Sequence, residues 1–279
     1  MRIAVSGNEG FIAPYLFSLL DGIADEVPEE ALTDSRQLDA ALASAQVLIH
    51  FHGHPPGEDL DRNDPEVPRV MQSVSRLIVD AKKRHQGLHM ILVGSLRVHS
   101  EADEDGFHGK STLSPRDATA EGQLYMEERA LENATENSPV SILRLGNVHG
   151  MPLEGEKGRG YLHDFAGQAL VGWVSVPGDG TGVKDIIHVK DVCSIIAEIA
   201  HNPPLTREAL AIGNGWTYPI SELAETMARE MGAEVQLWAD ERDELWGAVD
   251  ARHLQQRIEY EPMVSIEEVM GEAISNASF

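Results

Sequence analysis

The sequence predicts an α/β fold: a doubly wound, mostly parallel sheet with a small C-terminal lobe. Short apolar runs alternate with longer segments in which apolar residues recur at helical spacing. A glycine-rich turn joins the first apolar run to the first helical segment, as at the start of a βαβ unit. The 279 residues allow one large domain with an added lobe, and they bury a sizeable core without disulfides or metals.

Each element follows from a local pattern, since a short apolar run predicts a buried strand and a 3.6-residue period predicts a helix. The expected strands are Arg2–Ser6, Val47–Phe51, Met90–Val93, Val140–Leu145 and Ile186–Val189. The expected helices are Phe11–Leu20, Val67–His85, Ala118–Ala134, Leu162–Val171, Asp191–His201 and Ser221–Met231, the last with Ser221 as its N-cap. A polar, acidic loop is expected from Ser100 to about Asp117.

The charge balance limits the partners of this protein. Acidic residues number 46 and basic residues 22, for a formal net charge of −24, which disfavours nucleic acids and anionic membranes. No apolar run reaches the ~18 residues needed to cross a bilayer, and the first residues do not resemble a signal peptide. Cys193 is the single cysteine, so we expect a cytoplasmic protein without an internal disulfide. The acid excess fits either a high-salt environment or an ordinary acidic protein.

The glycine pattern of the first turn predicts a dinucleotide site. Gly7, Gly10 and Ala13 form a Gly-x-x-Gly-x-x-Ala sequence between the first strand and the first helix. Gly7 permits the tight turn, Gly10 lets the backbone approach a diphosphate, and the small Ala13 lets helix and strand pack closely. The helix N-terminus offers N–H groups and a partial positive charge to the phosphates. The alternative is a structural turn that binds nothing.

From this point the chain resembles a known family, the NAD-dependent epimerase/dehydratase family of extended short-chain dehydrogenases. The likeness extends along nearly the whole chain and is carried by the segments Arg2–Ile12, Val47–Gly53, Val93–His99, Leu143–Gly150, Gly178–Val192 and Ala211–Ala224. The resemblance implies a Rossmann-type domain, residues 1–150 completed by about 186–213, and a substrate lobe, residues 151–185 and 214–279. It also implies a homodimer that pairs the helices Val67–His85 and Ala118–Ala134.

The resemblance assigns site residues by position. A bound NAD or NADP would contact Gly7, Asn8, Gly10, Phe11, Ile12, Asp34, Phe51, His52, Gly53, Gly94, Asn147 and Val148. Ser95 matches the catalytic Ser/Thr, and Arg97, His99 and Lys184 would face the substrate. Lys184 replaces the family's Arg, which keeps the charge but loses the bidentate fork.

Two departures from the family leave alternatives open. The strand that reads the adenosine ribose is abbreviated, so Glu26, Glu29 or Glu30 would serve there, and NAD against NADP is undecided. The family's Tyr-x-x-x-Lys has one counterpart in spacing, Tyr125 with Arg129, and Arg supplies charge but relays no proton.

Other helix registers remove the Tyr–Lys pair altogether. They place either Ala120 and Leu124 or Thr119 and Gln123 at the two positions. In that case His99, His149 or His163 would be the group that titrates near neutral pH.

Three alternating histidines, His50, His52 and His54, would share one face of a continuing strand, as metal ligands require. We expect no metal, because Gly53 and Pro55 end the strand within this run. The sequence thus predicts an NAD(P)-dependent enzyme that transfers a hydride to or from a hydroxylated small molecule, with Ser95, Tyr125 and Arg129 as catalytic residues. The alternatives are a dinucleotide-binding sensor or complex partner without turnover, and an enzyme that has abandoned nicotinamide.

Overall fold

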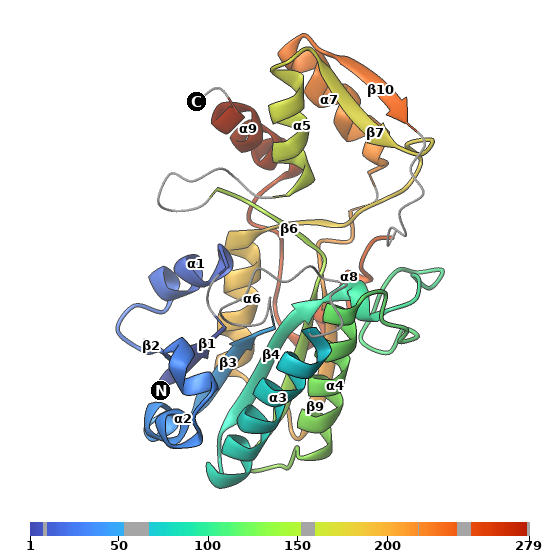
Figure 1. Ribbon diagram of the computed structural model, residues 1–279. Coiled ribbons are helices and arrows are strands. Elements are labelled where there is room, and N and C mark those ends of the chain that lie inside the picture. The colour runs from blue at the N-terminus through green and yellow to red at the C-terminus, as the bar shows by residue number, and fades with distance from the viewer. Residues whose placement is uncertain (8–9, 53–66, 152–159, 217, 239–246, 278–279) are drawn as a thin grey trace. The chain divides into compact units, whose positions relative to one another are not determined.

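The computed structural model describes residues 1–7, 10–52, 67–151, 160–216, 218–238 and 247–277. The chain forms two compact units (Figure 1). The first consists of Met1–Ser100, Gly109–Leu145 and Ile196–Leu210, and the second of Glu101–His108, Gly146–Ile195 and Ala211–Phe279.

The first unit is built on a six-stranded sheet with the order β2-β1-β3-β4-β5-β9, which confirms the Rossmann-type α/β fold. Its strands are β1 (Ile3–Ser6), β2 (Ala24–Glu26), β3 (Val47–Phe51), β4 (His89–Ser95), β5 (Val140–Leu145) and β9 (Arg207–Ile212). Strands β1 to β5 pair in parallel. Their carboxyl ends therefore meet at one edge of the sheet, which is where ligands bind in open α/β sheets.

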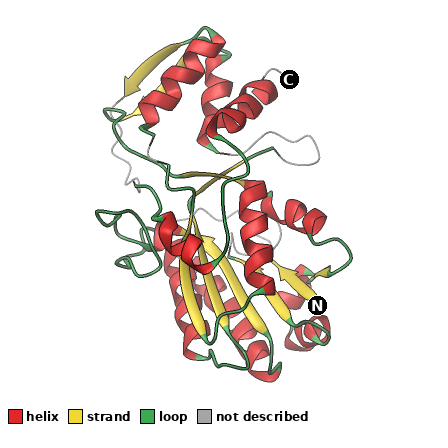
Figure 2. Ribbon diagram, turned by 180° about the vertical axis from the view of Figure 1, so that it is seen from behind, coloured by secondary structure: helices red, strands yellow, loops and turns green. Residues whose placement is uncertain are grey.

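Helices lie on both faces of this sheet, and this explains the continuous apolar runs (Figures 1 and 2). The helices are α1 (Ile12–Leu19), α2 (Ser35–Leu42), α3 (Val67–Arg84), α4 (Ala118–Glu132) and α6 (Val189–His201), with 3-10 turns at Glu29–Leu32 and Leu96–Val98. Ala4, Leu48 and Met90 share one core cluster with α2, α3 and α4. The intervening strand residues, such as Val5 and Ile49, point to the opposite face and are equally buried.

The short strand β2 explains why the sequence pattern left this region undefined. Its three residues pair with Ile3 to Val5 of β1 at the sheet edge and are mostly exposed. A polar edge strand carries no apolar run, so hydrophobic periodicity does not detect it.

The second unit has a core of its own. Strand β7 (Trp173–Pro177) pairs in parallel with β10 (Glu234–Trp238), and β6 (Asn147–His149) pairs in parallel with β8 (Ile186–His188). The helices are α5 (Tyr161–Ala169), α7 (Ile220–Met231), α8 (Ala251–Arg257) and α9 (Ile266–Ala277). Side chains of α5, α7, α9 and β7 form one apolar cluster. The helix α6 is divided between the units after Ile195. Its residue Cys193 is buried in the part that belongs to the second unit, as expected for a small hydrophobe.

The start of α7 corrects one expectation. Pro219, not Ser221, is the N-cap residue, with φ −58° and ψ 142° and no side-chain cap bond. Ser221 lies in the first turn, and its N–H donates to the Gly180 carbonyl (3.1 Å). The carbonyl of Gly180, and not the Ser221 hydroxyl, thus accepts a backbone N–H bond at the start of α7.

No helix in the described part is both long enough and apolar enough to span a bilayer. The large hydrophobic side chains that this part exposes belong to segments other than α3 and α4. Leu77 of α3 and Leu124, Tyr125 and Leu131 of α4 are partly exposed. The pairing of these two helices in a homodimer stays a prediction.

The carboxylate of Asp185 organises the second unit. It is fully buried and accepts backbone N–H bonds from Asn214 (2.8 Å), Gly215 (2.8 Å) and Val249 (2.9 Å). These donors come from two segments far apart in the sequence, so one side chain fixes both. Burial raises the pKa of the Asp185 carboxyl to about 6, and the three N–H bonds oppose that rise.

We expect Asp185→Asn to destabilise the protein by about 1–3 kcal/mol at pH 7, because the amide presents N–H groups to a backbone donor. The folded pKa of Asp185 lies above its ordinary 3.8, so this group adds stability as the pH falls from 7 to 5. The variant lacks that gain, and its deficit grows by about 1.3 kcal/mol. Urea unfolding at both pH values measures it. Asp179→Asn, on an exposed turn, is the control and should change much less, and equal losses would contradict the assignment.

Candidate functional site

The turn after β1 is built for a glycine at position 7. Gly7 has φ +69°, and a Cβ there would lie 2.2 Å from the carbonyl oxygen of Phe51 at the end of β3. No other residue fits against that strand end. A Cβ at Gly10 would meet nothing within 4 Å, so protein packing does not require this glycine and leaves room above it. Asn8 lies outside the described residues.

The N-terminus of α1 fits an anion. The N-cap residue Phe11 makes no side-chain cap bond, and the first turn from Ile12 holds no acidic residue. The helix therefore presents its N-terminal partial positive charge, and its own first turn contains no carboxylate. Together with the close approach of Gly7 to β3, this arrangement has the features that a dinucleotide diphosphate requires.

His50 of β3, next to this turn, is uncharged at neutral pH. The Oγ atom of Ser6 lies 2.9 Å from Nδ1 of His50, and both residues are buried. Burial lowers the pKa of His50 to about 3, with a smaller contribution from His52. His50 therefore adds no positive charge at neutral pH. The structure shows no group of three metal-ligating side chains within the residues it describes. Gly53 and His54 fall outside that part.

His52 follows β3 and faces α4. Its N–H donates to the Val93 carbonyl of β4 (2.7 Å). The Nε2 atom of its ring is enclosed and has no hydrogen-bond partner among the described residues. Burial lowers the pKa of His52 to about 4.

At the carboxyl end of β4, the side-chain amide of Gln123 on α4 makes two hydrogen bonds to the backbone of Ser95. The Ser95 N–H donates to Oε1 of Gln123 (2.9 Å), and Nε2 of Gln123 donates to the Ser95 carbonyl (3.1 Å). A Cβ at Gly94 would lie 2.3 Å from Nε2 of Gln123, so this bidentate contact requires the glycine. The Oγ of Ser95 accepts from the N–H of Arg97 (3.3 Å).

A buried polar chain continues from Gln123. Its Nε2 donates to Oε1 of Glu127 (2.7 Å), and Oε2 of Glu127 accepts from Nη2 (2.7 Å) and Nε (3.1 Å) of Arg144. Both charged side chains are buried, with 2% and 3% exposed. Nη1 of Arg144 donates to Nε2 of His99 (3.3 Å) and to the Gly109 carbonyl (3.2 Å).

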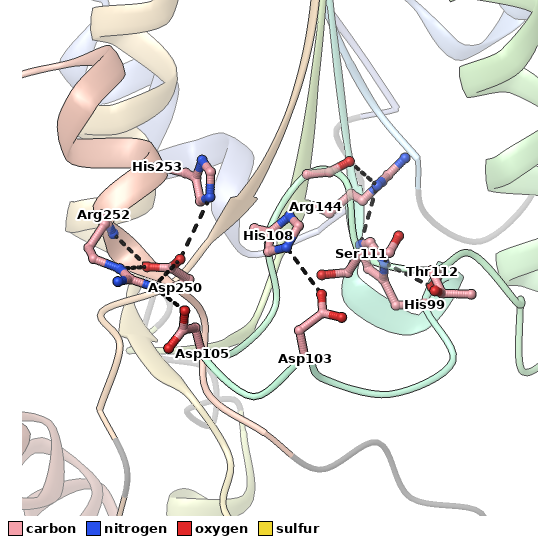
Figure 3. Close-up of polar contacts among 11 residues, drawn as sticks. His99, Asp103, Asp105, His108, Ser111, Thr112, Arg144, Asp250, Arg252 and His253 are labelled. Carbon is pink, nitrogen blue, oxygen red and sulfur yellow. Dashed lines mark hydrogen bonds and ion pairs between the residues drawn. The ribbon is translucent and has the colours of Figure 1, made fainter.

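His99 ends this chain and is fully buried rather than open to a ligand. Figure 3 shows its contacts with Ser111, Thr112 and Arg144. Its Nδ1 lies 3.2 Å from the Ser111 carbonyl and 3.3 Å from that of Thr112, so Nδ1 carries the proton. Nε2 then accepts from Arg144. Because both ring nitrogens have protein partners, the described contacts give His99 a structural role, although the resemblance had placed it on the substrate side.

The rotation of α4 decides which residues meet Ser95. Tyr125 lies two positions after Gln123, about 200° around the helix, and so on a different face. Its ring contacts Arg129, whose guanidinium carbon is 5.7 Å from the ring centroid, and Arg129 pairs with the exposed Glu132. The structure thus brings Gln123, and not Tyr125 or Arg129, to Ser95.

Thr119 lies one turn before Gln123, and its Oγ1 is enclosed without a partner. Of the registers that the sequence left open, the one with Thr119 and Gln123 is therefore the one that faces Ser95.

Arg97 and Asp34 are held by local contacts. Nε of Arg97 donates to Oδ2 of Asp117 (2.6 Å), whose Oδ1 caps α4 by accepting from the Ala120 N–H (2.7 Å). Asp34 caps α2 through bonds from the N–H groups of Arg36 and Gln37.

Glu26 is the last residue of β2, paired with Val5 of β1. Glu29 and Glu30 lie in the following 3-10 turn. The structure therefore separates three acids that the sequence could not rank, because Glu26 alone lies at a strand's carboxyl end.

Three expected site residues belong to the second unit. The N–H and Nδ2 of Asn147 both donate to the Asp185 carbonyl (3.1 Å each), and Val148 pairs with Ile187 in β6 and β8. Lys184 precedes Asp185, and its backbone forms an isolated parallel β-bridge with Gly247.

The acidic loop contributes a segment to the second unit (Figure 3). Asp105 pairs with Arg252 (2.8 Å), which also binds Asp250 (2.7 Å). Phe107 is buried and exchanges backbone bonds with Ala248 and Asp250.

Comparison with known sequences supports the interpretation of the glycine turn. The sequence profile of the NAD dependent epimerase/dehydratase family matches residues 3–213. A dTDP-glucose 4,6-dehydratase from Actinoplanes sp. is 27% identical over 161 residues, 57% of this chain and 49% of that protein. The matched region is thus about half the length of that relative.

Solved structures share the fold over the whole chain. The dTDP-glucose 4,6-dehydratase of Bacillus anthracis, solved with NAD, has a TM-score of 0.80 at 17% identity and covers 100% of this chain and 96% of its own. RMD of Pseudomonas aeruginosa, complexed with NADPH, has a TM-score of 0.79 at 19% identity and covers 99% and 98%.

We expect Arg144→Met to destabilise the protein by about 3–5 kcal/mol, because it leaves Glu127 buried without its counter-charge. Replacing Glu127 as well, in Glu127→Met/Arg144→Met, should recover part of that loss. Urea unfolding of both single variants and the double variant measures the coupling. Additive losses would show that the two charges do not depend on each other.

Proposed function

This chain belongs to the NAD-dependent epimerase/dehydratase family, and we propose that it is an NAD(P)-dependent enzyme acting on a nucleotide sugar by hydride transfer. The observation that carries the proposal is the glycine turn of Gly7 packed on Phe51, beside the helix α1, whose first turn holds no acidic residue and whose N-cap residue Phe11 makes no side-chain cap bond. This cradle suits a diphosphate.

The residues of the first unit divide into two tasks. Gly7, Gly10, Phe11 and Ile12 would hold the diphosphate, with Asn8 between them, and Phe51, His52 and Gly53 would border the rest of the dinucleotide. The dinucleotide supplies hydride chemistry when it is bound. Ser95 would hydrogen-bond the oxygen of the reacting carbon, and Gln123 would hold the backbone of Ser95 in place for that contact.

The position of Glu26 supports NAD as the preferred cofactor. An acid at the end of the second strand accepts a hydrogen bond from the adenosine 2′-hydroxyl and repels a 2′-phosphate. Glu26 lies at that strand end and is exposed. Relatives with known cofactors include proteins solved with NAD and with NADPH, so this residue is the local feature that favours one over the other.

A second candidate is a dinucleotide-binding protein without turnover. The face of α4 that meets Ser95 carries Thr119, Gln123 and Glu127, and none of these is the phenol or amine expected from the family's Tyr-x-x-x-Lys. This observation favours a sensor or a complex partner over an enzyme.

Calorimetry and product analysis test the proposal. We expect the protein to bind NAD or NADP, and to convert at least one of dTDP-glucose, UDP-glucose and UDP-galactose as followed by chromatography. Ser95→Ala should lower kcat by about a hundredfold or more, because it removes a hydrogen bond to the reacting oxygen. Tight binding without conversion would favour the sensor. No binding of either dinucleotide at millimolar concentration, in low and in high salt, would refute both.

We expect Glu26→Ala to shift the ratio of the Kd values for NAD and NADP toward NADP by at least about tenfold, or ~1.4 kcal/mol. The reason is the loss of repulsion between a carboxylate and the 2′-phosphate. Glu30→Ala, in the adjacent 3-10 turn, is the control and should leave the ratio unchanged. A shift in the control and none in Glu26→Ala would move the assignment to the turn.

A further inference from the structure

Arg97 follows Ser95 in the same 3-10 turn, and the protein uses only part of its guanidinium. Nε of Arg97 donates to Oδ2 of Asp117 (2.6 Å), and the Arg97 backbone N–H donates to Oγ of Ser95 (3.3 Å). Within the residues that the structure describes, this side chain has no further partner. It is 29% exposed and neither Nη atom is enclosed, so the Nη donors are open to solvent.

Asp117 orients this guanidinium through a single contact. The Asp117 side chain is 4% exposed, and its second oxygen, Oδ1, caps α4 by accepting from the Ala120 N–H (2.7 Å). A carboxylate held at both oxygens has little freedom to move, and it meets Arg97 at Nε alone. The end of the guanidinium that carries Nη1 and Nη2 is therefore held in one direction, with the two parallel donors that bind a planar anion bidentately.

The course of α4 places this pair above the carboxyl end of β4. Strands β4 and β5 are parallel, and α4 connects them, so the helix begins at the level of their carboxyl ends. Gln123 of α4 meets Ser95, and the cap residue Asp117 lies about 9 Å further along the helix axis, toward its N-terminus. Ligands bind outside the carboxyl ends of the strands in such sheets. The guanidinium is therefore at the level of a bound substrate.

The two arginines near Ser95 differ in how completely the protein uses them. The side chain of Arg144 is 3% exposed, and its Nε, Nη1 and Nη2 atoms all donate to protein acceptors. Arg97 is held at Nε and leaves its Nη groups open. A guanidinium with every donor satisfied serves the fold, whereas one that is held at one atom and open at the others is preorganised for a ligand.

We propose that Arg97 is a specificity-determining residue that binds a carboxylate on the sugar ring of the substrate, so that the preferred substrate is a nucleotide-linked uronic acid. This inference rests on the proposed function and goes beyond it in naming the class of sugar. Ser95 would contact the sugar at its reacting carbon, and an anion next to Ser95 is then a substituent of the same ring. A carboxylate takes both Nη donors in parallel, whereas a hydroxyl does not match their geometry.

Calorimetry of the wild type compares UDP-glucuronic acid with UDP-glucose, each in the presence of NADH. We expect UDP-glucuronic acid to bind at least about tenfold more tightly, because its carboxylate pairs with the guanidinium. The ratio of the two Kd values should fall toward one as the salt concentration is raised, since salt screens this attraction. This readout does not depend on the folding of any variant.

Substitutions of Arg97 test the assignment directly. We expect Arg97→Gln to weaken the binding of UDP-glucuronic acid about tenfold or more and to leave UDP-glucose within about threefold of the wild type. Arg97→Lys keeps the charge without the fork and should retain part of the preference. The double variant Arg97→Gln/Asp117→Asn leaves no unpaired carboxylate that could repel the ligand, and it should lack the preference as well.

Arg84→Gln is the matched control. Nε of Arg84 pairs with Asp39 (2.9 Å), much as Nε of Arg97 pairs with Asp117, but Arg84 is the last residue of α3 and precedes the amino end of β4. This variant should bind both nucleotide sugars as the wild type does. Thermal unfolding of each variant confirms that it is folded under the conditions of the calorimetry.

The outcomes separate this inference from the proposed function. A wild type that binds a dinucleotide and UDP-glucose without favouring UDP-glucuronic acid overturns the role of Arg97 and leaves the proposed function standing. Equal losses for both nucleotide sugars in Arg97→Gln also overturn it, because the guanidinium would then contact a group that the two share, such as the diphosphate. Failure of the wild type to bind any dinucleotide overturns both.

Discussion

The buried ion pair between Glu127 and Arg144 is the constraint on which the site depends. Two charges can stay in a protein interior only if each is paired and its remaining atoms are hydrogen-bonded. Here Gln123, His99 and the Gly109 carbonyl supply those further bonds. The pair ties α4 to β5, and Gln123 ties the same helix to β4. The rotation of α4 is therefore fixed by buried charge, and this rotation decides which side chains meet Ser95.

Glycines allow the approach of α4 that these bonds need. Gly94 makes room for the amide of Gln123, and a Cβ at Gly122 would lie 2.6 Å from the sulfur of Met71 on α3. The helices α3 and α4 and the end of β4 therefore pack so closely that a side chain at Gly94 or Gly122 would collide with its neighbours.

The proposed binding of an anionic cofactor by an acidic protein requires a favourable electrostatic potential at the binding turn itself. The net charge of −24 creates a repulsive average field, but exposed charges more than about 10 Å away are largely screened at ordinary ionic strength. The first turn of α1 contains no acid, and neighbouring His50 is neutral. The partial charge of the helix N-terminus and its backbone N–H groups then act at close range.

The sequence by itself determined the fold class, most of the elements and the glycine turn, because buried strands, amphipathic helices and a turn requiring positive φ each leave a local pattern. The strand Val140–Leu145 has the expected bounds, and Gly7 has the expected role in the turn. The tertiary structure decided what no local pattern encodes. It selected Gln123 over Tyr125, buried His99 against Arg144 and put Glu26 at the end of an edge strand. The physical reason is that periodicity defines the buried face of a helix, whereas contacts between residues distant in sequence choose which turn of that face meets which strand.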